Sequence, residues 1–150
     1  MKYSKRIQLS KNKSSIVILA SNKIGFEIIN ILKDKIKINT IITTNNITSE
    51  PFYKKLKKNN IKKFIFLDNQ NFNDYKNKKR LKLIKIDILI NASWNRLIPE
   101  WFLSKVKILS VGGHASPNKL NLGKGQSPLS WIIMSGYKSF NFYMFKIYSI

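Results

Sequence analysis

The chain has 150 residues, of which 43% are hydrophobic and 12% aromatic, enough for one packed domain, and this composition argues against general disorder. The absence of cysteine excludes disulfides, a thiolate nucleophile and cysteine-ligated metal, and a single histidine excludes a histidine-rich zinc site, so we expect no metal. The formal net charge of +21, from 28 Lys and Arg against 7 Asp and Glu, is typical of proteins with polyanionic partners.

The positive charge has a second interpretation. Lysine is accompanied throughout by asparagine and isoleucine, as in KNNIKKFIF, a bias that an AT-rich genome imposes on any protein it encodes. Specific phosphate or base recognition favours arginine, and only Arg80 and Arg96 lie inside the expected fold. We therefore interpret most of the charge as compositional and keep nucleic-acid binding as an alternative.

Residues 1–14 are basic and polar, and we expect them to form a tail in front of a single domain, residues 15–150. The apolar run Ile16–Ala20 is too short for a signal core or a membrane span. We therefore expect a cytoplasmic protein without a membrane span.

The first half of the chain alternates strands and helices. Ser15–Ala20 is a β-branched apolar run typical of a buried strand, and Ser21–Lys33 then changes to helical spacing. Ile36–Thr43 and Lys63–Leu67 are predicted strands on either side of a helix over Glu50–Asn60. This alternation predicts a mostly parallel sheet with right-handed crossovers.

The second half continues the alternation after a polar loop at Asp68–Asn77. The predicted strands are Asp87–Asn91, Lys107–Val111 and Ser139–Ile147, and the predicted helices are Lys78–Lys85, Pro99–Val106 and Ser127–Ser135. The fold class that follows is α/β: a Rossmann-like, mostly parallel sheet with helices on both faces.

Ligands of open α/β sheets bind beyond the carboxyl ends of the strands. Two expected loops lie there, residues 92–98 and residues 112–126, and they place Trp94, Asn95, Arg96 and His114 around one crevice. Imidazole titrates near neutrality and suits proton transfer, although a lone histidine can also serve only as a hydrogen-bonding group. After the first strand, ASNKIG lacks the G-x-G-x-x-G spacing, which leaves Ser21 and Asn22 as weak phosphate candidates.

A longer pattern joins these segments. N-A-S-W-N-R-L-I-P precedes a strand, then G-G-H-A-S-P, then G-K-G-Q-S-P-L-S-W-I-I-x-x-G. This order resembles the folate-dependent formyltransferase family, which includes methionyl-tRNA formyltransferase, glycinamide ribonucleotide transformylase and the sugar N-formyltransferases. The positions that match in order are His114, Ser116, Lys124, Gly125, Pro128, Trp131 and Gly136.

The resemblance implies transfer of a formyl group from 10-formyltetrahydrofolate to a small-molecule primary amine. It makes His114 the catalytic histidine, adds Ser116 to the catalytic segment, and assigns the loop with Trp94, Asn95, Arg96, Leu97 and Ile98 to the pterin ring. Lys124 and Gly125 would belong to a substrate loop.

Two departures from the family pattern affect the expected activity. Gly112 occupies the position of the family's asparagine, so one donor to the oxyanion is missing. The family's aspartate is expected just beyond Ile150, and we therefore expect a domain truncated at its C-terminus, with impaired activity.

The sequence leaves several functions open. The run S-P-L-S-W-I-I resembles the sugar and methionyl-tRNA branches of the family, and of the two we expect a nucleotide-linked amino sugar as the amine. The alternatives are a protein like methionyl-tRNA formyltransferase, an inactive remnant that still binds folate, and a basic nucleic-acid-binding module.

Overall fold

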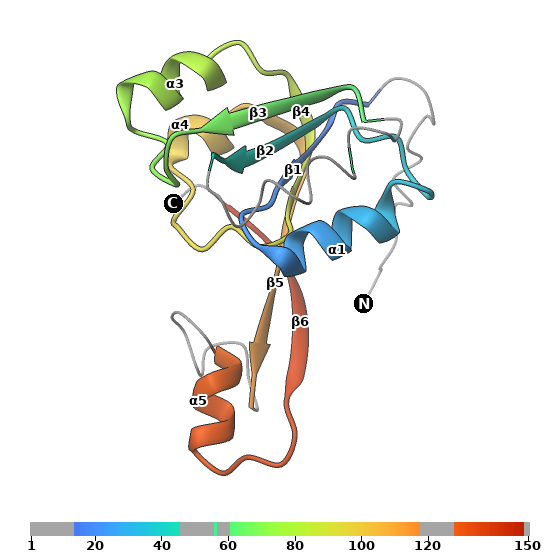
Figure 1. The fold of residues 1–150 in the computed structure, drawn as a ribbon, viewed down its shortest axis with the longest axis vertical. Helices are drawn as coiled ribbons and strands as arrows, with labels where there is room; N and C mark the ends of the chain where they lie inside the picture. Colours follow the sequence, from blue (N-terminus) through green and yellow to red (C-terminus); the bar gives the residue numbers. More distant parts are fainter. Residues whose placement is uncertain (1–13, 46–55, 57–60, 118–127, 149–150) are drawn as a thin grey trace, which may run out of the picture.

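One sheet of six strands organises the molecule, in the order β3-β2-β1-β4-β5-β6 (Figure 1). The computed structural model describes residues 14–45, 56, 61–117 and 128–148. The strands are β1 Ile16–Leu19, β2 Thr40–Thr44, β3 Lys63–Leu67, β4 Ile86–Asn91, β5 Val106–Ser116 and β6 Asn141–Lys146.

The first five strands are parallel and the last is antiparallel. β1 lies in the centre, where Val17 pairs with Thr40 of β2 on one side and with Leu89 of β4 on the other. All four residues of β1 are buried, as the continuous apolar run predicts for a strand covered on both faces. β6 pairs with β5 in the antiparallel direction and forms the edge of the sheet.

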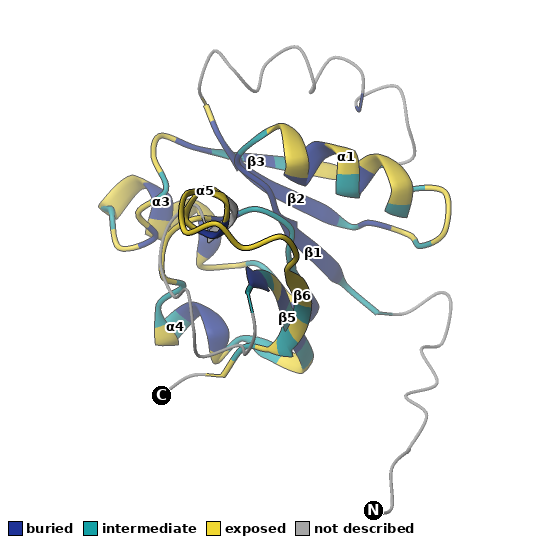
Figure 2. Cartoon of the chain, turned by 90° about the horizontal axis from the view of Figure 1, so that it is seen from below, coloured by how far each residue is buried: buried dark blue, intermediate teal, exposed yellow. Residues whose placement is uncertain are grey.

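Helices cover both faces of the parallel part of the sheet (Figure 2). Helix α1, Lys23–Leu32, buries Phe26 and Ile29 in one core cluster. Helices α3, Tyr75–Leu81, and α4, Glu100–Leu103, contribute Leu81 and Phe102 to the second cluster. The predicted fold class is therefore confirmed. The predicted helix over residues 50–60 lies outside the described residues except for Leu56, which is helical and buried.

Several predicted boundaries are wrong. The helix expected at residues 78–85 is α3, which ends at Leu81 and begins at Tyr75, because the Asp74 side chain accepts hydrogen bonds from the amides of Lys76 and Asn77. The helix expected at residues 99–106 ends at Leu103, since Val106 already pairs with Ile86 in the sheet. The strand expected from residue 36 begins only at Thr40.

Strand β5 also differs from its prediction, since it continues to Ser116 instead of ending at Val111. With β6 and helix α5, Pro128–Met134, its second half projects from the sheet as an arm (Figure 1). We call residues 112–116 and 128–148 the α5–β6 arm. Within the part of the chain that the structure describes, no helix is long and apolar enough to cross a membrane.

Candidate active site at the carboxyl ends of β4 and β5

The segment that carries His114 is a strand and not the loop that the sequence predicts. Val111–Ser116 pair with Lys146–Asn141 of β6, and His114 lies opposite Tyr143. The glycine pair does not interrupt the strand, because β6 supplies a hydrogen-bonding partner along its whole length.

The histidine lies just past the end of the neighbouring strand. β4 ends at Asn91, which pairs with Gly112, so Gly113–Ser116 extend beyond β4. The loop after β4 and the segment with His114 therefore start side by side, at Asn91 and Gly112. The amides of Ala92 and Ser93 then donate to the Leu19 carbonyl at the end of β1.

Alternation along β5 puts Gly112, His114 and Ser116 on one face. His114 is half-buried and Ser116 is fully buried. A Cβ atom at Gly112 would lie 3.3 Å from both Phe145 Cζ and Ile147 Cδ1. Apolar side chains of the β6 segment thus occupy the space that a side chain at position 112 would need.

Gly113 faces the other side of the arm. A Cβ atom there would collide with the ring of Phe142, with Cε1 at 2.7 Å, and would approach Met144 Sδ at 3.4 Å. Each glycine of the pair therefore allows an apolar side chain of β6 to pack closely against β5, so the pair is explained by packing on both faces.

The loop after β4 begins with a fixed turn. The Trp94 amide donates to Asn91 Oδ1 at 2.7 Å, and Asn91 Nδ2 donates to the Trp94 carbonyl at 3.3 Å. The Trp94 side chain is 4% exposed and stacks on Phe72 with ring centroids 5.1 Å apart. Trp94 therefore anchors the loop to the core.

The next residues of this loop face solvent. Asn95, Arg96 and Leu97 are exposed, Leu97 to 97%, and Ile98 packs partly against the core. Within the described ranges, the amides of Asn95, Arg96 and Leu97 donate no hydrogen bond. Three unpaired amides beside an exposed apolar side chain fit a flat heterocycle whose edge accepts hydrogen bonds.

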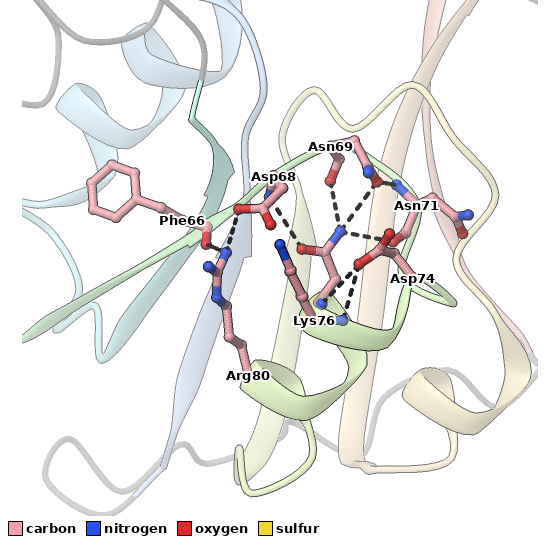
Figure 3. A network of polar contacts seen from close by, with 8 residues as sticks. Phe66, Asp68, Asn69, Asn71, Asp74, Lys76 and Arg80 are labelled. Atoms are coloured by element: carbon pink, nitrogen blue, oxygen red, sulfur yellow. Dashed lines mark hydrogen bonds and ion pairs between the residues drawn. The ribbon is translucent and has the colours of Figure 1, made fainter.

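The loop after β3 supports the loop after β4. Asn77 is fully buried at its centre: its Oδ1 accepts from the Asp68 amide, and its Nδ2 donates to the carbonyls of Asn69 and Asn71 (Figure 3). Trp101 Nε1 donates to Asn73 Oδ1 at 2.8 Å. The loop that presents Phe72 to Trp94 is thus held by a polar network.

Two further residues occupy the point between β1 and β4 where the strand order reverses. The Ser21 amide donates to Ser93 Oγ at 3.0 Å, and Ser21 Oγ donates to the Ser93 carbonyl at 2.6 Å. Asn22 caps α1 by accepting from the Gly25 amide. A Cβ at Gly25 would collide with Ser93 Oγ, so glycine is needed where α1 approaches this loop. Ser21 and Asn22 therefore have structural roles.

The sequence analysis missed Ser93 and Tyr143. Ser93 lies directly before the Trp94 turn, but its contact with Ser21 spans 72 positions and gives no local signal. Tyr143 lies opposite His114, and only the weak alternation over residues 139–147 pointed to a strand there. Lys124 and Gly125 lie outside the described residues.

The two arginines near these loops differ in their contacts. Arg80 donates to the Phe66 carbonyl and pairs with Asp68 at 2.8 Å, whereas Arg96 is exposed. Among the described residues, no group of three or more His, Cys, Asp or Glu side chains could hold a metal ion.

Solved structures match this arrangement over most of the chain. A phosphoribosylglycinamide formyltransferase from Streptococcus pneumoniae TIGR4 has a TM-score of 0.70 at 14% identity, covering 92% of this chain and 76% of its own. The enzyme of that name from Bacillus Halodurans has a TM-score of 0.68 at 16% identity, covering 91% and 73%. This chain has the formyltransferase fold.

A third matching structure has the name of a different enzyme. A formyltetrahydrofolate deformylase from Pseudomonas putida KT2440 matches with a TM-score of 0.64 at 16% identity, over 93% of this chain and 50% of its own. This chain thus spans half of the deformylase and about three quarters of the first two structures. No family model matches the sequence, and no curated protein matches it.

Proposed function

We propose that this chain is a folate-dependent formyltransferase that transfers a formyl group from 10-formyltetrahydrofolate to a primary amine. The observation that carries the proposal is the register of β4 and β5. It pairs Asn91, the last residue of β4, with Gly112, two residues before His114, and so supports a site shared by His114 and the loop after β4, where three amides donate no hydrogen bond within the described ranges. The shared fold supports the same assignment.

The reaction needs few groups from the protein. The amine nitrogen attacks the formyl carbon, a C–N bond forms, and the carbonyl oxygen becomes an oxyanion. The bond from that carbon to the folate nitrogen then breaks, and the amine proton passes to that nitrogen. His114 stabilises the oxyanion and assists the proton transfer, while the amides of Asn95, Arg96 and Leu97 hold the pterin edge.

Position 112 lowers the expected rate. Glycine has no side-chain donor, and loss of one oxyanion donor costs roughly 10²- to 10³-fold in turnover. We therefore expect a slow enzyme, with the backbone and His114 as the remaining sources of stabilisation.

The amine acceptor is a finer proposal. The run Ser127–Ile133 favours a nucleotide-linked amino sugar, and the matching solved structures include enzymes named for phosphoribosylglycinamide. Because those structures are only 14–16% identical to this chain, they do not decide between the two amines. Both amines belong in the assay.

The first test is a calorimetric titration that measures binding of 5-formyltetrahydrofolate, a stable analogue of the formyl donor. Leu97→Ala should weaken binding about tenfold, because Leu97 is exposed beside the unpaired amides. Leu83→Ala is the matched control, because Leu83 is 89% exposed and lies just before the start of β4, at the opposite end of that strand. Equal loss in both variants, or no saturable binding by the wild type, would contradict the proposed cofactor site.

The second test is turnover with 10-formyltetrahydrofolate and each amine. His114→Ala should lower formylation by about 10²-fold or more while leaving 5-formyltetrahydrofolate binding within about twofold. An unchanged rate in this variant would exclude His114 as a catalytic residue.

A further inference from the structure

A cavity of about 670 Å³ lies at the edge of the sheet opposite His114. It is formed by the turn after α1 and the segments that lead into β2 and β3. Its lining residues are Lys33, Asp34, Lys35, Ile36, Lys37, Ile38, Ile61 and Lys62. The turn is held in place because the amides of Lys35 and Ile36 both donate to the Leu32 carbonyl at 2.9 Å.

The cavity is more positive than the chain as a whole. Four of the eight described residues that line it are lysines, against 28 Lys and Arg among 150 residues. Asp34, the one carboxylate among these eight, forms no ion pair with the lysines within the described ranges. The lysines of the described lining are therefore not neutralised by that carboxylate, and their share exceeds that of the chain as a whole.

The base of the cavity is apolar. Ile38 is 2% exposed and belongs to the core cluster beneath α1, and Ile36 and Ile61 pack against that cluster while half-buried. A ligand here would place charged groups among the lysines and an apolar group on the isoleucines. The volume lies within the range of about 300–1,000 Å³ typical of small-molecule sites.

We propose that this cavity binds a small, multiply phosphorylated compound that carries an aromatic ring, such as a nucleoside diphosphate. Lysine binds phosphate oxygens as a point charge, and several lysines in one hollow suit a ligand with more than one negative charge. The lysines gather at one open hollow of about 670 Å³, a size that favours a small ligand over a nucleic-acid strand. This site is independent of the proposed formyl transfer.

The test uses ADP and inorganic pyrophosphate as probes in calorimetric titrations at fixed ionic strength. Wild-type protein should bind one ADP saturably and pyrophosphate more weakly, because pyrophosphate has no ring for the isoleucines. The double variant Lys35→Gln/Lys37→Gln should weaken ADP binding about tenfold. The control Lys76→Gln/Lys79→Gln removes the same charge from exposed positions on α3 and should change it less than twofold.

A second variant keeps the test informative if the lysine variants fold poorly. Asp34→Asn removes the one carboxylate among the described lining residues and should strengthen ADP binding about threefold. Equal weakening in both double variants would show that binding follows total charge and would overturn the proposal. Absence of saturable ADP binding, or saturable binding only to single-stranded RNA, would overturn it as well.

Discussion

Trp94 holds the candidate pterin loop through its side chain, and the stability of the protein should depend on it. Its indole packs between the loop and Phe72, while its Nε1 is buried without a hydrogen-bond partner among the described residues. Trp94→Ala should lower the free energy of unfolding by about 3–5 kcal/mol because it leaves a cavity. Denaturant unfolding followed by circular dichroism measures the change.

Trp94→Phe is the informative comparison. Phenylalanine keeps the stack on Phe72 and removes a buried donor whose lack of a partner costs about 1–3 kcal/mol. We therefore expect Trp94→Phe to stay within about 1 kcal/mol of the wild type. A loss as large as that of Trp94→Ala would contradict this expectation and would show that the indole contributes more than its stack on Phe72.

This residue also marks the limit of the sequence analysis. The pattern N-A-S-W-N-R-L-I-P predicts where the loop lies, but it cannot tell that the tryptophan points into the core while Leu97 points to solvent. That difference depends on Phe72, which comes from another loop and is itself stacked on Phe102 at 4.7 Å. Long-range packing of this kind leaves no periodic signal.

At the level of elements, the loop between β3 and α3 depends on Asn77. Asn77→Leu should lower the free energy of unfolding by about 2–4 kcal/mol, since it leaves the Asp68 amide and two backbone carbonyls without a partner in a buried place. Chemical denaturation provides the measurement. Asn45→Leu, at an exposed position, is the control and should change stability by less than about 0.5 kcal/mol. Similar values for the two variants would contradict a central role for Asn77.

The alternation of strands and helices and most strand positions could be predicted, because buried parallel strands are short apolar runs. The order of the strands in the sheet was not predicted. For example, the predicted strand Lys63–Leu67 has the same first and last residues as β3. The end of β5 could not be predicted, because two glycines and a histidine are typical of a turn, and the sequence does not show that β6 pairs with them. The start of α3 was predicted too late, because the helix that Asp74 caps has a polar first turn, which resembles a loop in the sequence.

At the scale of the whole molecule, the α5–β6 arm groups several exposed apolar side chains of the described part of the chain. Trp131, Ile133, Met134, Phe142, Met144 and Tyr148 are each 63–76% exposed. Residues 128–148 carry only two lysines and no acidic residue, and β6 is an edge strand, so charge protects this surface weakly against pairing. We expect the 150-residue chain to self-associate as its concentration rises.

Sedimentation velocity tests this expectation. Ile133→Lys/Met144→Lys should reduce the associated fraction to about half or less at the same protein concentration. Ile24→Lys/Ile31→Lys adds the same charge to exposed positions on α1 and should change it little. An equal effect of both pairs would show that net charge, and not the arm, controls association.

The packing around Gly112 limits how the protein sequence can evolve. An asparagine at this position would bring its Cβ to 3.3 Å from Phe145 Cζ and Ile147 Cδ1, so these two side chains would have to move by a few tenths of an ångström. Smaller residues at positions 145 and 147 would remove that crowding. Substitutions at the three positions are therefore coupled, and the effect of a side-chain donor at position 112 depends on which residues stand at positions 145 and 147.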